Sequence, residues 1–338
     1  MTTHPLPEKL TDDARWLAQA MDASTGAIRF VEMNREAYRA SSFLDDRIFQ
    51  SSIKSIVCGL DEVTQAVPSS LRSDARWIFH IGHVGSTLIA RLLGEIEGVL
   101  SVREPRILRD LAALEPPERQ ALMPAIQRLF SRTFAADETA LIKATSLVSE
   151  IARDLVPQGQ RALFLFEDPR TYIEGILAGE NSRKEQHVLA DVRARRMEQR
   201  VERLIGAERS DAHRAAAAWA CEMTALEAAA EAMPDRALLW AKFDTMLGDM
   251  PGSLERLASF FGFAAPGSRL REIASGPLMG RYSKALEYEY SPSLRRDLLA
   301  EAGRAHRADI DQAIAMLTDA ARTSPLLARA LSRAELEA

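Results

Sequence analysis

Five short apolar runs, each separated from the next by longer amphipathic stretches, constrain the fold of this chain more than any other feature. The runs are continuous rather than alternating in polarity, which is typical of strands buried on both faces of a parallel sheet. Helical patterns lie between most of them, so the alternation predicts an α/β fold with a central five-stranded parallel sheet between two layers of helices. The five runs are residues 77–81, 99–102, 140–143, 162–166 and 237–240.

Residues 1–70 precede this alternation and contain no recognisable chemistry. Apolar residues recur there with helical spacing between Leu10 and Met21, which predicts a helical N-terminal segment packed on the core. Residues 71–338 are expected to form the α/β domain, and the pattern becomes mostly helical after residue 250.

Composition excludes several classes of function. The chain of 338 residues has 43 basic and 48 acidic side chains, and a net charge of −5 disfavours binding to nucleic acid or to an anionic membrane. Its two cysteines, Cys58 and Cys221, exclude a disulfide framework and a cysteine zinc cage. No apolar run approaches the roughly 18 residues of a membrane span, and the first residues lack the apolar stretch of a signal peptide. We therefore expect a cytoplasmic protein, and its richness in arginine and alanine is typical of GC-rich bacterial genomes.

The most informative segment leads from the first strand through a glycine turn into a helix. Gly82 and Gly85 allow positive φ and close approach of the backbone to a bound group, and Ser86 and Thr87 begin the helix. The N–H groups and the dipole at this end of a helix bind anions, and the two hydroxyls add donors. The segment does not match the ATP-type P-loop motif, because two residues rather than four separate the glycines and no lysine follows. An ordinary turn capped by Ser86 is the alternative interpretation.

This segment resembles the 5′-phosphosulfate loop of sulfotransferases. Gly85, Ser86 and Thr87 match the last three positions of the family's Lys-Ser-Gly-Thr-Thr turn, and His83 stands where the family has lysine or arginine. A protonated His83 would supply the missing positive charge. The resemblance extends over about residues 76–285. It implies a P-loop-like three-layer fold and 3′-phosphoadenosine 5′-phosphosulfate (PAPS) as donor co-substrate, held in part by Gly82, His83 and the three matching residues.

Two further matches supply candidate catalytic residues. Glu104 follows the second strand, where several branches of the family place the glutamate that takes the proton of the acceptor hydroxyl. A solvated Glu104 paired with Arg103 or Arg106 is the alternative. Lys143 ends the third strand and matches the lysine of the family's Lys-Thr-His, which contacts the transferred sulfuryl group. Thr145 stands in place of the histidine, which leaves the role of base to Glu104.

This sequence matches only some of the residues with which the family binds the donor's 3′-phosphate. Arg170 matches the second arginine of the family's Arg-Asp-Pro-Arg, whereas Glu167 and Gly175 stand in place of the first arginine and of a serine. A late basic loop that contains glycine resembles the family's cover over the same phosphate, and an exposed surface loop is the alternative. The candidate ligands in this loop are Arg281, Ser283 and Lys284.

Together the matches imply a sulfotransferase that moves a sulfuryl group from PAPS to a hydroxyl or amine of a small-molecule acceptor. No spacing of histidines indicates a metal site, and none is proposed. Two alternatives stay open. The chain could be a descendant of this fold that has lost its donor site and serves as a binding or scaffold protein, or a different P-loop transferase that uses ATP or another phosphate donor.

Overall fold

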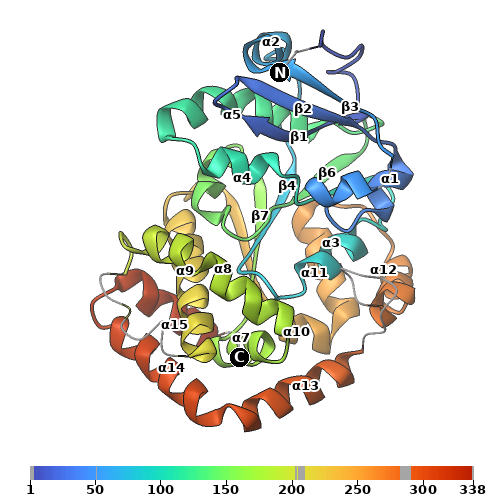
Figure 1. The fold of residues 1–338 in the computed structure, drawn as a ribbon. Coiled ribbons are helices and arrows are strands. Elements are labelled where there is room, and N and C mark those ends of the chain that lie inside the picture. The colour runs from blue at the N-terminus through green and yellow to red at the C-terminus, as the bar shows by residue number, and fades with distance from the viewer. Residues whose placement is uncertain (1–3, 51, 202–203, 205–209, 282–290, 337–338) are drawn as a thin grey trace.

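The computed structural model describes residues 4–50, 52–201, 204, 210–281 and 291–336. Five parallel strands form the central sheet, in the order β5-β6-β4-β7-β8. Figure 1 shows helices on both sides of these strands, which confirms the predicted three-layer α/β class. The five predicted strands are all present. They are β4 (Arg76–His80), β5 (Val99–Arg103), β6 (Thr139–Lys143), β7 (Arg161–Phe166) and β8 (Ala237–Lys242).

The order of the strands places a crevice at the carboxyl end of β4. This strand is central, and its apolar residues Trp77 to Phe79 are fully buried. The chain first builds β5 and β6 on one side of β4, and then crosses over to build β7 and β8 on the other. Ligands of open α/β sheets bind outside the carboxyl ends of the strands at such a reversal.

Helices make up most of the rest of the α/β part. None of the described helices is long and apolar enough to cross a membrane. The stretch 292–321, predicted as helical, is interrupted at His306. The helices are α3 (Ser86–Leu93), α4 (Ile107–Ala112), α5 (Pro116–Ser131), η2 (Ser149–Ile151), α6 (Ala152–Leu155), α7 (Pro169–Leu177), α8 (Glu180–Met197), α9 (Asp211–Glu231), α10 (Phe243–Gly248), α11 (Met250–Phe261), α12 (Gly267–Ala274), η3 (Pro277–Gly280), α13 (Pro292–Ala305), α14 (Arg307–Ala320) and α15 (Pro325–Leu336).

The prediction of a helical N-terminal segment is wrong. Residues 16–59 contain a three-stranded antiparallel sheet of β1 (Trp16–Asp22), β2 (Ala27–Glu32) and β3 (Ser55–Gly59), with short helices beside it. Every residue from Trp16 to Met21 is buried, so this run lacks the polar face that an amphipathic surface helix would need. A tight turn then reverses the chain, with Gly26 in the left-handed region at φ +59°.

The N-terminal sheet is attached to the α/β part near the crevice. β1 packs against α4 and α5. The segment that follows α1 (Arg35–Ala40) is fixed to the end of β5, because the Leu44 N–H donates to the Arg103 carbonyl over 2.8 Å. The remaining helices of this region are η1 (Asp46–Gln50) and α2 (Leu60–Ala66). Residues around Leu44 thereby reach the carboxyl ends of the parallel strands.

Candidate functional site

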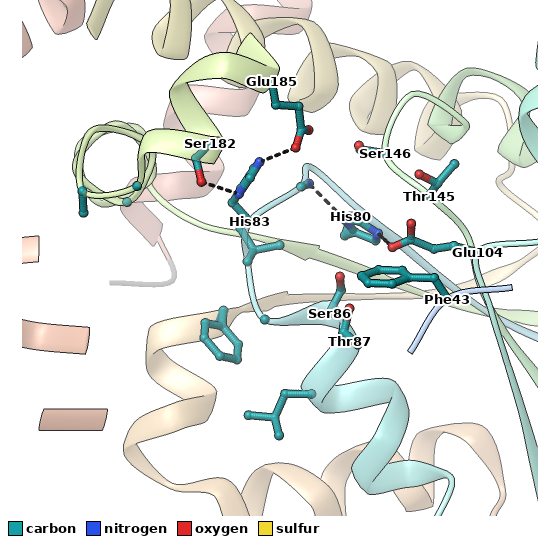
Figure 2. A pocket seen from close by; sticks show the side chains of 18 of the residues that line it. Phe43, His80, His83, Ser86, Thr87, Glu104, Thr145, Ser146, Ser182 and Glu185 are labelled. Atoms are coloured by element: carbon teal, nitrogen blue, oxygen red, sulfur yellow. Dashed lines mark hydrogen bonds and ion pairs between the residues drawn. The ribbon is translucent and has the colours of Figure 1, made fainter. Parts of the chain in front are cut away.

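A cavity of about 680 Å³ opens at the carboxyl ends of the parallel strands. It is lined by the loop between β4 and α3, the ends of β5 and β6, the helices α7, α8 and α13, and the N-terminal residues Phe43 and Arg47. Figure 2 shows part of this lining, including Phe43, His83 and Glu104. Its rim also includes the apolar side chains Val188, Leu294 and Leu298, all of which are exposed. The cavity therefore combines a polar base with apolar side chains from two facing helices.

The loop from β4 to α3 has the backbone of an anion site. Gly82, His83 and Gly85 all adopt left-handed conformations, with φ of +83°, +54° and +65°. Turns of this kind, followed by a helix N-terminus, direct several N–H groups towards one concavity. Gly85 is also required sterically, because a Cβ there would lie 2.0 Å from the ring of Phe243. The predicted glycine turn is therefore present, with both glycines in left-handed conformations that residues with a side chain rarely adopt.

Thr87 carries an unsatisfied hydroxyl at the start of α3. Its side chain is only 2% exposed, and its Oγ1 has no hydrogen-bond partner among the described residues. A buried polar atom without a partner costs about 1–3 kcal/mol. Thr87 and Ser86 both line the cavity at the N-terminus of α3, where backbone N–H groups and the helix dipole favour an anion.

His80, which the sequence analysis did not assign to the site, fixes the position of this loop. Its Nδ1 accepts the Gly82 N–H over 3.0 Å, and its Nε2 donates to the Ala144 carbonyl over 2.9 Å. Because a carbonyl can only accept, the ring proton is on Nε2. His80 thereby joins the glycine turn to the end of β6. The position of His80 as the last residue of a strand before a glycine turn was the signal in the sequence that could have identified it.

Glu104 lies at the end of β5 and faces the cavity. It adopts φ +53°, a strained conformation for a residue with a side chain, and its N–H donates to the Lys143 carbonyl over 2.8 Å. Lys143 donates to its carboxylate, and His80 Nε2 and Arg47 Nη2 lie 3.9 and 4.0 Å from it. The N-terminal region thus brings a cation to a predicted catalytic residue.

The alternative pairing of Glu104 with Arg103 or Arg106 is not observed. Arg103 is buried and donates to backbone carbonyls at the end of α1, including that of Ser41 over 3.0 Å from its Nε. Arg106 pairs with Asp46 instead. Glu104 therefore has its polar contacts with the residues around the cavity.

Lys143 is placed behind Glu104 rather than on the cavity surface. Its side chain is 1% exposed and does not line the cavity, and its ammonium group contacts the Glu104 carboxylate. The structure thus brings these two predicted catalytic residues together as a buried ion pair. In this arrangement Lys143 balances the charge of Glu104.

His83 lines the cavity between the loop and α8 (Figure 2). Ser182 Oγ lies 3.3 Å from its Nδ1, and Glu185 Oε2 lies 3.4 Å from its Nε2. The sequence analysis identified His83 but neither of its partners, which lie about 100 residues further along the chain. No local motif marks them.

The prediction that Arg170 binds the donor is not supported by its position. Its side chain is 47% exposed, does not line the cavity and pairs with Asp311 on α14 over 2.6 Å. Arg281 does line the cavity, and Ser283 and Lys284 lie outside the described residues. A second arginine, Arg295 on α13, lines the same wall, and the sequence analysis missed it because a single arginine in a helix carries no signal.

Glu167, at the end of β7, points away from the cavity. It is 1% exposed, and its carboxylate accepts the N–H groups of Asp244 and Asp168 over 2.9 and 3.1 Å. Burial, and then the charge of Asp244, raise the pKa of Glu167 to about 8. This residue therefore supports the junction of β7 with α10 and does not line the cavity.

Comparisons with known proteins give matches among solved structures alone. No protein-family model matches the chain, and no curated protein sequence matches it at a significant level. The sulfotransferase domain from the curacin biosynthetic pathway is 12% identical, with a TM-score of 0.45 over 74% of this chain and 99% of that domain. The sulfotransferase domain from the Synechococcus PCC 7002 olefin synthase is 14% identical, with a TM-score of 0.39 over 68% and 86% of the two chains.

A third solved structure, mouse sulfotransferase SULT7A1 complexed with PAP, is 12% identical, with a TM-score of 0.39 over 81% of this chain and 92% of that one. All three structures are sulfotransferases, the family that the sequence motifs resemble. At these sequence identities and TM-scores, the matches carry no argument about function. The function is therefore inferred from the residues of the cavity.

Proposed function

We propose that the chain is an enzyme that transfers a sulfuryl group from PAPS to a hydroxyl or amine of a small-molecule acceptor. One observation carries this proposal. The buried hydroxyl of Thr87, which has no partner among the described residues, and the carboxylate of Glu104 belong to the same cavity, the first at the N-terminus of α3 and the second at the end of β5. An anion site beside a carboxylate is what transfer between an anionic donor and a hydroxyl requires.

The residues of the cavity fit the two ends of the donor to different degrees. The left-handed loop and the Thr87 hydroxyl suit its 5′-phosphosulfate. Arg281 and Arg295 are the cavity-lining arginines from the C-terminal region, and they would meet its 3′-phosphate. When bound, PAPS supplies a sulfuryl group on a phosphate leaving group.

The side chains around Glu104 indicate the chemistry that the protein itself performs. Glu104 would accept the proton of the acceptor as its oxygen or nitrogen attacks sulfur. Lys143 and Arg47 balance the negative charge of this carboxylate, and φ +53° directs it from the strand end into the cavity. His83 would face the leaving phosphate from the loop. Most of the rate acceleration would come from these fixed charges and dipoles.

Calorimetric titration with adenosine 3′,5′-bisphosphate (PAP), beside ADP and ATP, tests the donor site. We expect micromolar binding that is selective for the 3′-phosphate. Binding of ATP in preference would support the different P-loop transferase, and no binding of any nucleotide at millimolar concentration would support the scaffold protein.

Thr87→Val gives the sharpest variant for this titration. The hydroxyl lacks a partner among the residues that the structure describes, so its removal should leave the stability unchanged or higher, while PAP loses a hydrogen bond worth about 1.5–3 kcal/mol, or roughly tenfold to 150-fold in affinity. The matched control is Thr224→Val. That buried hydroxyl donates to the Ala220 carbonyl over 2.7 Å, so the substitution lowers stability and leaves PAP affinity unchanged.

A further inference from the structure

Two side chains of α8 hold the two ring nitrogens of His83. Ser182 and Glu185 are three residues apart on this helix and so share one face of it, and both line the cavity (Figure 2). Ser182 Oγ lies 3.3 Å from Nδ1 and Glu185 Oε2 lies 3.4 Å from Nε2. An imidazolium donates from both nitrogens, and a hydroxyl and a carboxylate can both accept. Ser182 and Glu185 can therefore accept from both N–H groups of the charged ring.

We propose that Glu185 is a positioning residue that keeps His83 protonated and turned towards the bound phosphate. The inference rests on the proposed function, because it assigns the source of the positive charge that a loop without lysine needs. Glu185 acts through His83 and does not itself contact the donor. Ser182 fixes the orientation of the ring from the other nitrogen.

The other charged and titratable groups described near this loop are engaged differently. Glu104 has Lys143 as its ion-pair partner. The positive charge of the nearby arginines disfavours the protonated form of His83. Glu185 is at ion-pair distance from the imidazole. The described groups around the loop include Glu185 and Arg193 on α8, Tyr172 on α7, His80 and Glu104 at the ends of β4 and β5, and Arg281 and Arg295 across the cavity.

Titration of His83 followed by NMR tests this inference without any donor. An opposite charge within about 4–6 Å raises the pKa of a histidine by roughly 1 unit or more, so Glu185→Gln should lower the midpoint by about one pH unit. Glu180→Gln is the matched control, because that carboxylate lies on the same helix but is 72% exposed and pairs with Lys184. An unchanged midpoint in Glu185→Gln overturns the inference.

The pH dependence of PAP binding gives the second readout. We expect Glu185→Gln to bind PAP as well as the unsubstituted protein at pH 5.5, and up to about tenfold more weakly above the midpoint of its His83. His83→Lys should remove the pH dependence and make Glu185→Gln without effect in the double variant. A weaker affinity in Glu185→Gln that is the same at every pH would indicate a merely structural role and overturn the inference. Absence of PAP binding in every protein would instead overturn the proposed function, and the NMR titration would still decide the role of Glu185.

Discussion

The carboxyl ends of the parallel strands form two regions that share one sheet edge and differ in construction. At the open region, formed by the ends of β4, β5 and β6, polar groups face a cavity. The Thr87 hydroxyl has no partner among the described residues, and the Glu104 carboxylate lines the same space. Part of the hydrogen-bonding capacity of the open region is therefore available to a ligand.

At the closed region, formed by the ends of β7 and β8, polar groups satisfy one another. Glu167 accepts two backbone N–H groups, the Trp219 Nε1–H donates to the Glu167 carbonyl over 2.8 Å, and Lys242 lies 3.2 Å from Asp168. Both regions contain a glutamate directly after a buried strand. The difference shows that a carboxylate at a strand end indicates a site only where a cavity and unsatisfied polar groups accompany it.

The largest effect is expected from Glu104→Gln at the open region. PAP formation from PAPS, measured with a panel of hydroxyl and amine acceptors, should fall by about 10²–10⁴-fold because the base is lost. The free energy of unfolding should also fall, by on the order of 3 kcal/mol, because the buried Lys143 loses its ion pair with Glu104. Adding Lys143→Met should restore most of this stability but not the activity. An unchanged rate of PAP formation in Glu104→Gln would show that Glu104 is not the base. The open region would then not differ from the closed region of Glu167 in this respect.

Gly85→Ala should have the next largest effect. The added Cβ meets the Phe243 ring, and φ +65° costs a residue with a side chain roughly 1–2 kcal/mol. We expect PAP affinity to fall at least tenfold in calorimetric titration, because the loop must move. Gly248→Ala is the matched control, since nothing lies within 4 Å of a Cβ at that position. Equal PAP affinity in both variants would contradict the claim that the loop between β4 and α3 needs a glycine at position 85 to bind PAP.

Glu167→Gln tests the closed region through the pH dependence of stability. The pKa of Glu167 is about 8 in the folded chain and near 4.5 in the unfolded one, so between these values the folded state keeps a proton that the unfolded state has lost. Stability is therefore lost as the pH rises towards 8, by at most about 1.4 kcal/mol per pH unit. Urea unfolding between pH 5 and 8 should show a shallower decline in Glu167→Gln. Glu118→Gln, at an exposed position, is the control. If the free energy of unfolding falls with pH as steeply in Glu167→Gln as in the unsubstituted protein, Glu167 is not the group that causes the decline.

The smallest effect is expected from Arg170→Ala. Its guanidinium lies on the surface beside Asp311, so PAP affinity should change by less than about twofold. Arg295→Ala, on the cavity wall, should weaken PAP binding severalfold. A reversed ranking of these two variants would mean that the donor extends over the closed region.

The sequence predicted the sheet and the glycine turn because both depend on local signals. Continuous apolar runs indicate buried parallel strands, and Gly82 and Gly85 are needed at positive φ. The N-terminal sheet was missed because the spacing from Leu10 to Met21 also fits a helix, and the turn at Asp22 to Gly26 was the signal that decides against it.

The side chains that complete the candidate site could not be predicted in the same way. Arg47, Glu185 and Arg295 come from three separate regions, and their chemistry arises from contacts that the folded chain creates. Arg170 shows the reverse case. A motif placed it at the donor, but the first turn of α7 directs its side chain towards α14.

A crystal structure of the complex with adenosine 3′,5′-bisphosphate tests the difference between the two regions most directly. We expect the 5′-phosphate at the start of α3, hydrogen-bonded to Thr87, with Glu104 facing it across the cavity and Glu167 still bonded to the Asp244 N–H. A phosphate bound at the ends of β7 and β8, or a Thr87 hydroxyl that stays without a partner in the complex, would contradict this expectation.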